Sequence, residues 1–342
     1  MDLYGLFARW LRGEIPGKFM PWQVDLDTTN ICNQNCYYCN TADFRKAVPE
    51  FQPLDAYARL IEQLHNWRAH EPNIIGTLSN VIFSGGGEPT LLPGWETLVE
   101  QCIDCGFLVA MNTNGTNLDR LLTIPVAKLR TIAYIGVDID SGNPETYERI
   151  RRSLSPHSPF EKVKRTAAQL GELGLNLDMK ALLMPENTSP EEIRSFFQFA
   201  RDVKARSVHL RPVVLEGRAF GITGEVFESI RQCEVEFGMR AVVAVGRYEP
   251  RQYKRCHQLF LFPSFSADGE IYLCCEYKGR EDLCLGRWSD PSQDWRDLWC
   301  GDRHREIYHT LVTSLCKPCR PNTTNNRIEA AVGSKESDVG FI

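Results

Sequence analysis

Residues 30–40 read NICNQNCYYCN and carry three cysteines, Cys32, Cys36 and Cys39, in the spacing C-x3-C-x2-C. The segment VDLDT at 24–28 comes just before them and predicts a strand that ends at this loop. Three thiolates on one tight loop can bind three irons of a [4Fe–4S] cube and leave the fourth iron open, as catalytic metal sites do. A structural zinc site is the alternative, but it needs a fourth ligand, and no cysteine or histidine follows within the next twenty residues.

Around this loop, short apolar runs alternate with amphipathic segments as far as residue 246. The other expected strands are 80–84, 107–111, 131–137, 175–183 and 207–214, and helices with one apolar face are expected at 57–67, 95–102, 189–200 and 224–237. Six strand–helix units in series predict an α/β fold with a parallel sheet, because parallel neighbours need crossover helices. Six units fall short of the eight that close a full barrel, so we expect a partial (β/α)6 barrel.

Length and composition narrow the class of protein. The chain has 342 residues, room for two domains, and its net charge of −5 disfavours a nucleic-acid partner, which would need a basic surface. We find neither a signal peptide nor an apolar run of membrane-spanning length, so we expect a cytoplasmic protein with no membrane partner. In a reducing compartment, thirteen grouped cysteines predict metal binding rather than disulfides.

The cysteines also divide the chain. We expect an N-terminal extension at 1–22, the barrel at 23–250, a small domain at 251–320 and a polar tail or lid at 321–342. Seven of the thirteen cysteines lie between 256 and 319, which predicts a domain held by metal rather than by a large core.

Three further motifs follow the expected strands. Ser84–Pro89 reads SGGGEP after the second strand, residues 112–115 read NTNG after the third, and residues 136–151 read GVDIDSGNPETYERIR at the fourth. Together with the cysteine loop and its aromatic Tyr38, these motifs resemble those of the radical S-adenosylmethionine (SAM) superfamily, and the resemblance covers most of the chain.

The resemblance implies a chemistry. In that family SAM chelates the open iron through its amino and carboxylate groups, and one electron cleaves it to methionine and a 5′-deoxyadenosyl radical, which removes a hydrogen atom from the substrate. A flavodoxin- or ferredoxin-type protein is the expected electron donor. The residues that the resemblance places around SAM are Tyr38, Gly85, Gly86, Gly87, Glu88, Asn114, Asp138, Asp140 and Arg151.

Two of these assignments are specific. Glu88 would accept a hydrogen bond from the methionyl ammonium, and Arg151 would pair with the SAM carboxylate. Asp138 stands where the family has a serine, so its contact with the ribose or the methionyl end differs from the family pattern.

A second cysteine pattern lies in the C-terminal part. Cys256, Cys274, Cys316 and Cys319 resemble the twitch subdomain, a shortened relative of the SPASM extension, and imply one auxiliary [4Fe–4S] cluster closed by four thiolates. A zinc ion on the same four cysteines is the alternative, and Cys275 is the alternative to Cys274. Cys284 and Cys300 are either packing residues or surplus thiols.

The expected substrate residues lie near the fifth and sixth strands. They are Lys180, His209 and Arg211, and strand alternation puts His209 and Arg211 on one face. Arg211 would bind a carboxylate or phosphate, or else form an ion pair with Asp25, Asp27 or Asp178.

We expect an enzyme that acts on a small polar sugar or nucleoside. About thirty residues precede Cys32, too few for the leader-peptide-binding domain of many peptide-modifying relatives. The two-cluster layout resembles aminocyclitol dehydrogenases, and the segments from PWQVDLDTTNIC to GGGEPT resemble cytosylglucuronate decarboxylases of antibiotic biosynthesis. Sugar alcohol dehydrogenation and peptide or protein modification are the alternatives, and a non-catalytic iron–sulfur electron carrier is a third.

Overall fold

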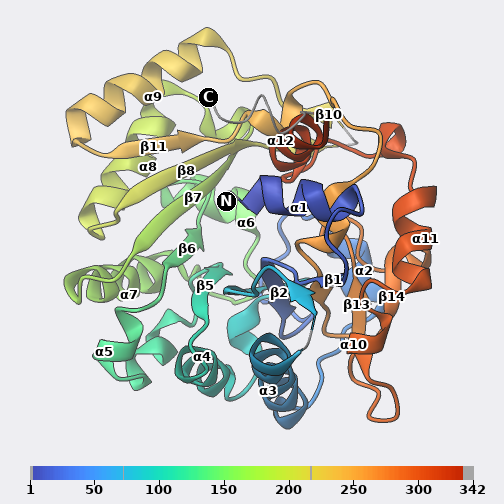
Figure 1. Cartoon of the computed structure of the whole chain (residues 1–342). Helices are drawn as coiled ribbons and strands as arrows, with labels where there is room; N and C mark the ends of the chain where they lie inside the picture. The colour runs from blue at the N-terminus through green and yellow to red at the C-terminus, as the bar shows by residue number, and fades with distance from the viewer. Residues whose placement is uncertain (1–2, 72, 216–217, 334–342) are drawn as a thin grey trace.

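The fold is built on one twisted sheet, seen here in a computed structural model that describes residues 3–71, 73–215 and 218–333. Its strand order is β11-β8-β7-β6-β5-β4-β2-β12-β13-β14 (Figure 1). From β11 to β12 every neighbouring pair is parallel, and β13 and β14 complete the sheet antiparallel. These strands are β2 (Gln23–Asp27), β4 (Asn80–Ser84), β5 (Leu108–Thr113), β6 (Tyr134–Asp138), β7 (Leu177–Leu183), β8 (Ser207–Pro212), β11 (Arg240–Val243), β12 (Ser264–Phe265), β13 (Glu270–Tyr272) and β14 (Cys284–Arg287).

All six expected strands are present, as β2, β4, β5, β6, β7 and β8. The six strand–helix units are therefore present, and the structure adds β11 as a further strand at the open edge, parallel to β8. This strand has only four residues, and none of them is buried, which is why apolar periodicity did not indicate it.

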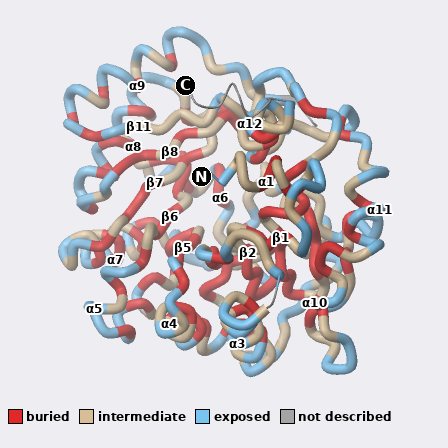
Figure 2. The backbone as a smooth tube through the Cα atoms, in the orientation of Figure 1, coloured by how far each residue is buried: buried red, intermediate tan, exposed pale blue. Residues whose placement is uncertain are grey.

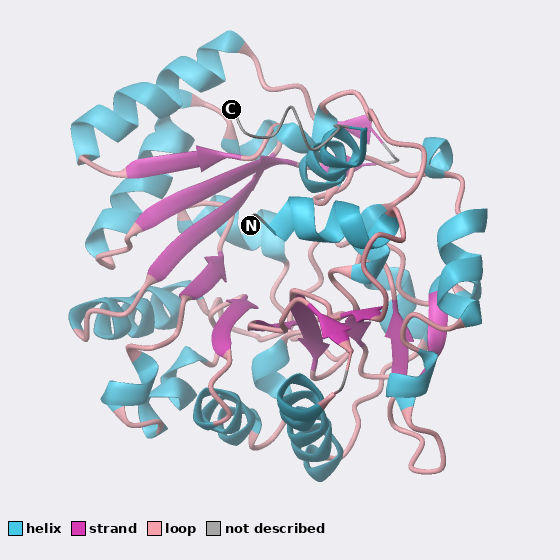
Figure 3. Ribbon diagram, in the orientation of Figure 1, coloured by secondary structure: helices cyan, strands magenta, loops and turns pink. Residues whose placement is uncertain are grey.

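Helices cover the outer face of the curved sheet (Figures 1 and 3). Their inward faces are apolar: in α3, Tyr57, Leu64 and Trp67 are buried, as the sequence predicted (Figure 2). Ser189 caps α8 as expected, since its side chain accepts from the backbone N–H of Glu192. The helices that follow barrel strands are α3 (Leu54–His70), α4 (Trp95–Asp104), α5 (Val126–Leu129), α6 (Pro144–Arg151), α7 (Phe160–Glu172), α8 (Pro190–Asp202) and α9 (Gly224–Phe237), and α2 (Ala42–Ala47) ends the cysteine loop.

The C-terminal part shares the sheet and the core of the barrel. β12 pairs with β2, and Trp288, Trp295 and Trp299 are buried in the same apolar core as the barrel residues. Trp295 packs edge-on against Trp67 of α3, with ring centroids 5.2 Å apart. The sequence predicted a domain held by metal rather than by a large core; the structure shows that this region shares the apolar core of the barrel, built with α10 (Trp295–Leu298) and α11 (Asp302–Thr310).

The first and last helices of the described residues pack together. α1 (Leu3–Leu11) packs against α12 (Asn322–Gly333), which lies in the segment expected as a tail (Figure 1). The remaining residues of that segment, 334–342, lie outside the described residues. Short two-residue strands complete the fold: β1 (Lys18–Phe19) pairs with β3 (Ile74–Ile75), and β9 (Val214–Leu215) with β10 (Arg218–Ala219).

Among the described residues, no helix is both long and apolar enough to span a bilayer.

Candidate active site

A cavity of about 330 Å³ opens at the carboxyl ends of the parallel strands. The loops after β2, β4 and β5 form one wall, and β6 and β8 contribute Asp138 and Arg211. Segments from the C-terminal part close the other side with Glu276, Lys317 and Pro318. This is the edge at which α/β barrels carry their chemistry.

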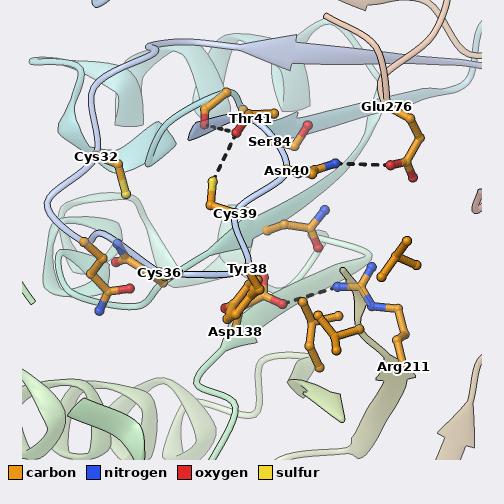
Figure 4. A pocket seen from close by; sticks show the side chains of 18 of the residues that line it. Cys32, Cys36, Tyr38, Cys39, Asn40, Thr41, Ser84, Asp138, Arg211 and Glu276 are labelled. Atoms are coloured by element: carbon orange, nitrogen blue, oxygen red, sulfur yellow. Dashed lines mark hydrogen bonds and ion pairs between the residues drawn. The ribbon is translucent and has the colours of Figure 1, made fainter. Parts of the chain in front are cut away.

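The three cysteines of the first group all line this cavity (Figure 4). A backbone hydrogen bond of 3.2 Å from Cys39 N to the Cys36 carbonyl makes the loop tight. Arg45 donates to Cys39 Sγ at 3.6 Å, and Cys36 Sγ lies 3.5 Å from the Arg151 carbonyl oxygen. Burial raises the pKa of the Cys32 thiol to about 11, and a bound metal would lower it, because the sulfur binds metal as a thiolate.

The glycines after β4 let two loops touch. A Cβ at Gly87 would lie 2.0 Å from the Ile31 carbonyl oxygen, and one at Gly86 would lie 2.2 Å from Asn30 Oδ1. Gly86 and Gly87 therefore allow the cysteine loop to pack directly on the loop after β4. All three glycines, Gly85 included, line the cavity.

Glu88 is buried beside the glycines and is fully engaged. Its carboxylate accepts from Thr113 Oγ1 at 2.6 Å, Asn114 N at 2.7 Å and Thr90 Oγ1 at 2.7 Å. Burial raises the pKa of Glu88, and these donors oppose the shift. Asn114 lines the cavity and donates to Asn33 Oδ1 at 2.8 Å, so Glu88 and Asn114 tie the loops after β2, β4 and β5 together.

Behind the cysteine loop lies a buried network around Arg151. Its guanidinium donates to Asp140 Oδ2 and to Gln34 Oε1, both at 2.9 Å, and to the Tyr38 hydroxyl at 2.5 Å. The Tyr38 hydroxyl in turn donates to Asp140. Tyr38 and Arg151 line the cavity wall, whereas Asp140 does not. The guanidinium of Arg151 is therefore held by protein partners on one side and reaches the cavity on the other.

The three substrate candidates are placed differently. Arg211 lines the cavity, 3.5 Å from Asp138 Oδ1, whereas neither Lys180 nor His209 does (Figure 4). Lys180 donates to Asn112 and lies 4.6 Å from the Tyr134 ring centroid, and burial lowers its pKa to about 8. His209 lies 3.7 Å from Asp178, which is one of the ion-pair partners considered for this face.

The second cysteine group surrounds a separate, small cavity. Its lining includes Cys256, Cys274, Cys316 and Cys319, whereas Cys275 is absent from that lining. Arg251 donates to the carbonyls of Cys316 and Lys317, at 2.8 and 2.6 Å, and so fixes the C-x2-C loop.

The remaining cysteines of the C-terminal part bond elsewhere. Cys284 Sγ donates to Glu270 at 3.2 Å, and the buried Cys300 Sγ lies 3.7 Å from the Phe19 carbonyl.

Five residues at these sites were missed by the sequence reasoning. Arg247, Glu276 and Lys317 line the main cavity, and Lys278 and Arg320 form ion pairs with Asp27 and Asp25 of β2. Four of the five lie next to a cysteine of the second group or within four residues of one, and this proximity was the available signal.

Comparison with known families settles the relationship. The sequence profile described as the radical SAM superfamily matches residues 26–200, just over half of the chain. The chain belongs to the radical SAM superfamily. Membership implies a [4Fe–4S] cluster and SAM as cofactors.

Curated relatives of this radical SAM protein include a GTP 3′,8-cyclase of Mannheimia succiniciproducens. It is 22% identical over an alignment of 315 positions that covers 85% of this chain and 85% of the relative. An S-adenosylmethionine-dependent nucleotide dehydratase of Selenomonas ruminantium is 28% identical over 128 residues, 37% of this chain and 42% of the relative. The match to this dehydratase is therefore confined to part of the chain.

Solved structures share the fold. Streptococcus suis SuiB bound to its precursor peptide SuiA has a TM-score of 0.65 at 14% identity, over 89% of this chain and 69% of SuiB. The histidine-tagged protein anSMEcpe with bound AdoMet has a TM-score of 0.59 at 16% identity, over 90% of this chain and 88% of that chain.

The cysteine loop fits the cluster that the family implies. Within the described ranges, no three histidine, cysteine or acidic side chains lie close enough to bind one metal ion. A cubane cluster holds its cysteine sulfurs farther apart, because each sulfur binds a different iron. Three sulfurs around one open cavity are therefore consistent with a cluster and a free iron, with Cys32, Cys36 and Cys39 as its ligands.

Proposed function

We propose that this radical SAM enzyme abstracts hydrogen from a small polar sugar or nucleoside in natural-product biosynthesis, and that the reaction is a decarboxylation of the cytosylglucuronate type. One observation carries the proposal. The main cavity is bounded on one side by Cys32, Cys36 and Cys39 and on the other by Glu276 and Lys317, which belong to the loops of the second cysteine group. A substrate there lies between two redox sites.

The size of the cavity and the activities named for the curated relatives favour a small-molecule substrate. Its volume of about 330 Å³ lies at the lower end of the range for small-molecule pockets. The names of the relatives, a GTP cyclase and two nucleotide dehydratases, favour a nucleoside-like substrate over a peptide. These points support a sugar or nucleoside substrate over a peptide or protein substrate.

Around SAM, the proposed division of work follows the contacts. Gly85–Glu88 and Asn114 form the wall that SAM packs against, and Asp138, a quarter of whose side chain is exposed, contacts its ribose or methionyl end. Tyr38, Asp140 and Arg151 hold the cysteine loop in place. Arg151 lines the cavity and would pair with the SAM carboxylate while its bonds to Asp140 and Gln34 orient the guanidinium.

We propose an auxiliary [4Fe–4S] cluster on Cys256, Cys274, Cys316 and Cys319. Their common cavity supports this set, and its lining favours Cys274 over Cys275. A zinc ion needs four ligands about 2.3 Å from one point. The first cluster, which membership of the family implies, favours iron–sulfur over zinc at these four cysteines as well.

The proposed reaction is balanced as follows. When bound and reduced, a cluster on Cys32, Cys36 and Cys39 would supply the radical that takes one hydrogen atom from the substrate. Loss of the carboxylate as CO2 would then leave an intermediate that needs one electron and two protons to become the product. A flavodoxin- or ferredoxin-type donor would supply the electrons, and a cluster on Cys256, Cys274, Cys316 and Cys319 would pass the second one to this intermediate. In the alternative dehydrogenation, that second cluster would accept one electron and a base would accept one proton.

The test is anaerobic incubation of the iron-loaded protein with SAM, reduced flavodoxin and cytosylglucuronate, read by mass spectrometry. Decarboxylation predicts equal amounts of 5′-deoxyadenosine and CO2. Formation of 5′-deoxyadenosine with no CO2 and a product two mass units lighter would assign dehydrogenation instead. No reaction with sugar acids, together with modification of a peptide substrate, would rule out both sugar reactions.

A further inference from the structure

Arg211 presents a guanidinium to the main cavity with its donors largely unused. Within the described part of the chain it makes no hydrogen bond, and its ion pair with Asp138 is long, at 3.5 Å. Its Nε is buried and has no partner. Arginine carries five N–H donors in a planar fork, so this side chain is poised to bind a planar oxyanion through two hydrogen bonds.

A second guanidinium lies close by. Arg247, in the short helical turn Gly246–Tyr248, lines the same cavity. Tyr248, which follows Arg247, donates a 2.7 Å hydrogen bond from its hydroxyl to the carbonyl of Pro212, which follows Arg211. This bond ties together the two segments that bring Arg211 and Arg247 to the cavity wall.

This part of the wall is distinct from the cysteine end of the cavity. Arg211 and Glu276 lie on the side away from Cys32 and Cys36 (Figure 4). The SAM carboxylate must stay at the cysteine end, because SAM chelates the open iron. The two arginines are thus available to a different ligand.

The charges of the wall limit what that ligand can be. Arg151 is paired with Asp140, Lys317 lies 3.8 Å from Glu276, and Asp138 faces Arg211. Once these pairs are counted, the cavity wall keeps only a small net positive charge. It matches one carboxylate and does not match the several charges of a nucleoside triphosphate.

We propose that Arg211, assisted by Arg247, binds a single carboxylate on the substrate and thereby selects a monoanionic sugar acid over a nucleoside triphosphate. This inference rests on the proposed function and names the group by which the substrate is recognised. Lys180 and His209 take no part in that contact, since neither lines the cavity.

The test measures binding without turnover. Isothermal titration calorimetry is carried out on the iron-loaded enzyme with SAM and no reductant. The probes are cytosylglucuronate, its methyl ester and cytidine triphosphate. Wild type should bind the acid more tightly than the ester or the triphosphate. Arg211→Gln should weaken binding of the acid about tenfold or more and leave the ester unchanged, and Arg211→Lys should recover part of the loss.

The matched control is Arg206→Gln. Arg206 lies just before the same strand, β8, but pairs with Asp178 at 2.7 Å and does not line the cavity, so its loss should leave binding of the acid unchanged. The inference is overturned if wild type does not prefer the acid, if Arg211→Gln weakens acid and ester equally, or if that variant instead loses affinity for SAM.

A separate readout distinguishes failure of the proposed function. Reduced Arg206→Gln enzyme, like wild type, should cleave SAM to 5′-deoxyadenosine without substrate. If even wild type fails to cleave SAM, the proposed function is wrong whatever the binding shows. If wild type cleaves SAM but binding ignores the carboxylate, only the present inference is wrong.

Discussion

Tyr38 illustrates how much a single hydroxyl contributes to the cysteine loop. Its hydroxyl is bonded to Arg151 and Asp140, both of which are buried. Tyr38→Phe keeps the ring but removes the hydroxyl that bonds to both members of the Arg151–Asp140 ion pair. We therefore predict a loss of about 1.5–3 kcal/mol in the free energy of unfolding. Denaturant unfolding measures it.

The neighbouring tyrosine provides the control. Tyr37 also bonds through its hydroxyl, to Glu186 at 3.0 Å, but is only partly buried. Tyr37→Phe should cost less than about 1 kcal/mol. Equal losses for the two variants would contradict the role given to the buried network.

Lys180 predicts a pH dependence of stability. Burial lowers its pKa to about 8, below the value near 10.5 of an exposed lysine. Between these two values the unfolded chain holds a proton that the folded protein has released. The contribution of Lys180 to stability therefore rises as pH increases from about 8 to 10.5, by at most about 1.4 kcal/mol for each pH increase of one within that range.

Lys180→Met removes the titration and keeps the stem of the side chain. The difference in unfolding free energy between wild type and this variant, measured from about pH 7 to about pH 10.5, should grow in favour of wild type. A flat difference would show that Lys180 keeps an ordinary pKa.

Cys274 and Cys275 are adjacent, but only Cys274 lines the cavity of the second group. With two cubane clusters the protein should hold about eight irons per chain. We predict that Cys274→Ser loses about half of this iron and that Cys275→Ser keeps it. Iron analysis of the anaerobically purified variants measures this, and the opposite pattern would assign Cys275 as the ligand.

At the scale of elements, β2 connects the two cysteine groups. Its carboxyl end leads into the Cys32–Cys39 loop, and its buried Asp27 pairs with Lys278, four residues after Cys274. Its Asp25 lies 3.3 Å from Arg320, which follows Cys319 directly. These two ion pairs fix the second group relative to the first.

The buried pair can be tested by a double-mutant cycle. Lys278→Met leaves the Asp27 carboxylate buried and unpaired, so we predict a loss of about 3–5 kcal/mol, largely recovered when Asp27→Asn is added. The exposed pair Arg303–Glu306 is the control, and Arg303→Met should cost less than about 0.5 kcal/mol. Additive losses at Lys278 and Asp27 would contradict the link.

The sequence predicted the elements that have strong local patterns. The six strands and the buried faces of α3 and α8 were predicted because period and capping are local signals. β11–β14 were not, since strands of two to four residues depend on long-range pairing. For the same reason, the sequence could name Arg211 as a site candidate, but only the tertiary structure shows that it lines the cavity rather than pairing with a core aspartate.

At the scale of the molecule, one sheet carries both cysteine groups. β12 continues the barrel from β2, so the C-terminal part shares its core with the barrel. The main cavity takes lining residues from both parts. A substrate bound there would contact residues of both parts.

The central claim is that the loop of Cys32, Cys36 and Cys39 holds a cluster with an open iron that cleaves SAM. The most direct measurement is 5′-deoxyadenosine formation by the anaerobically reconstituted, reduced protein given SAM alone. The account predicts 5′-deoxyadenosine from wild type and none from Cys36→Ala, while Cys284→Ala remains active. Wild type that forms none while carrying its iron, or Cys36→Ala that forms as much as wild type, would contradict it.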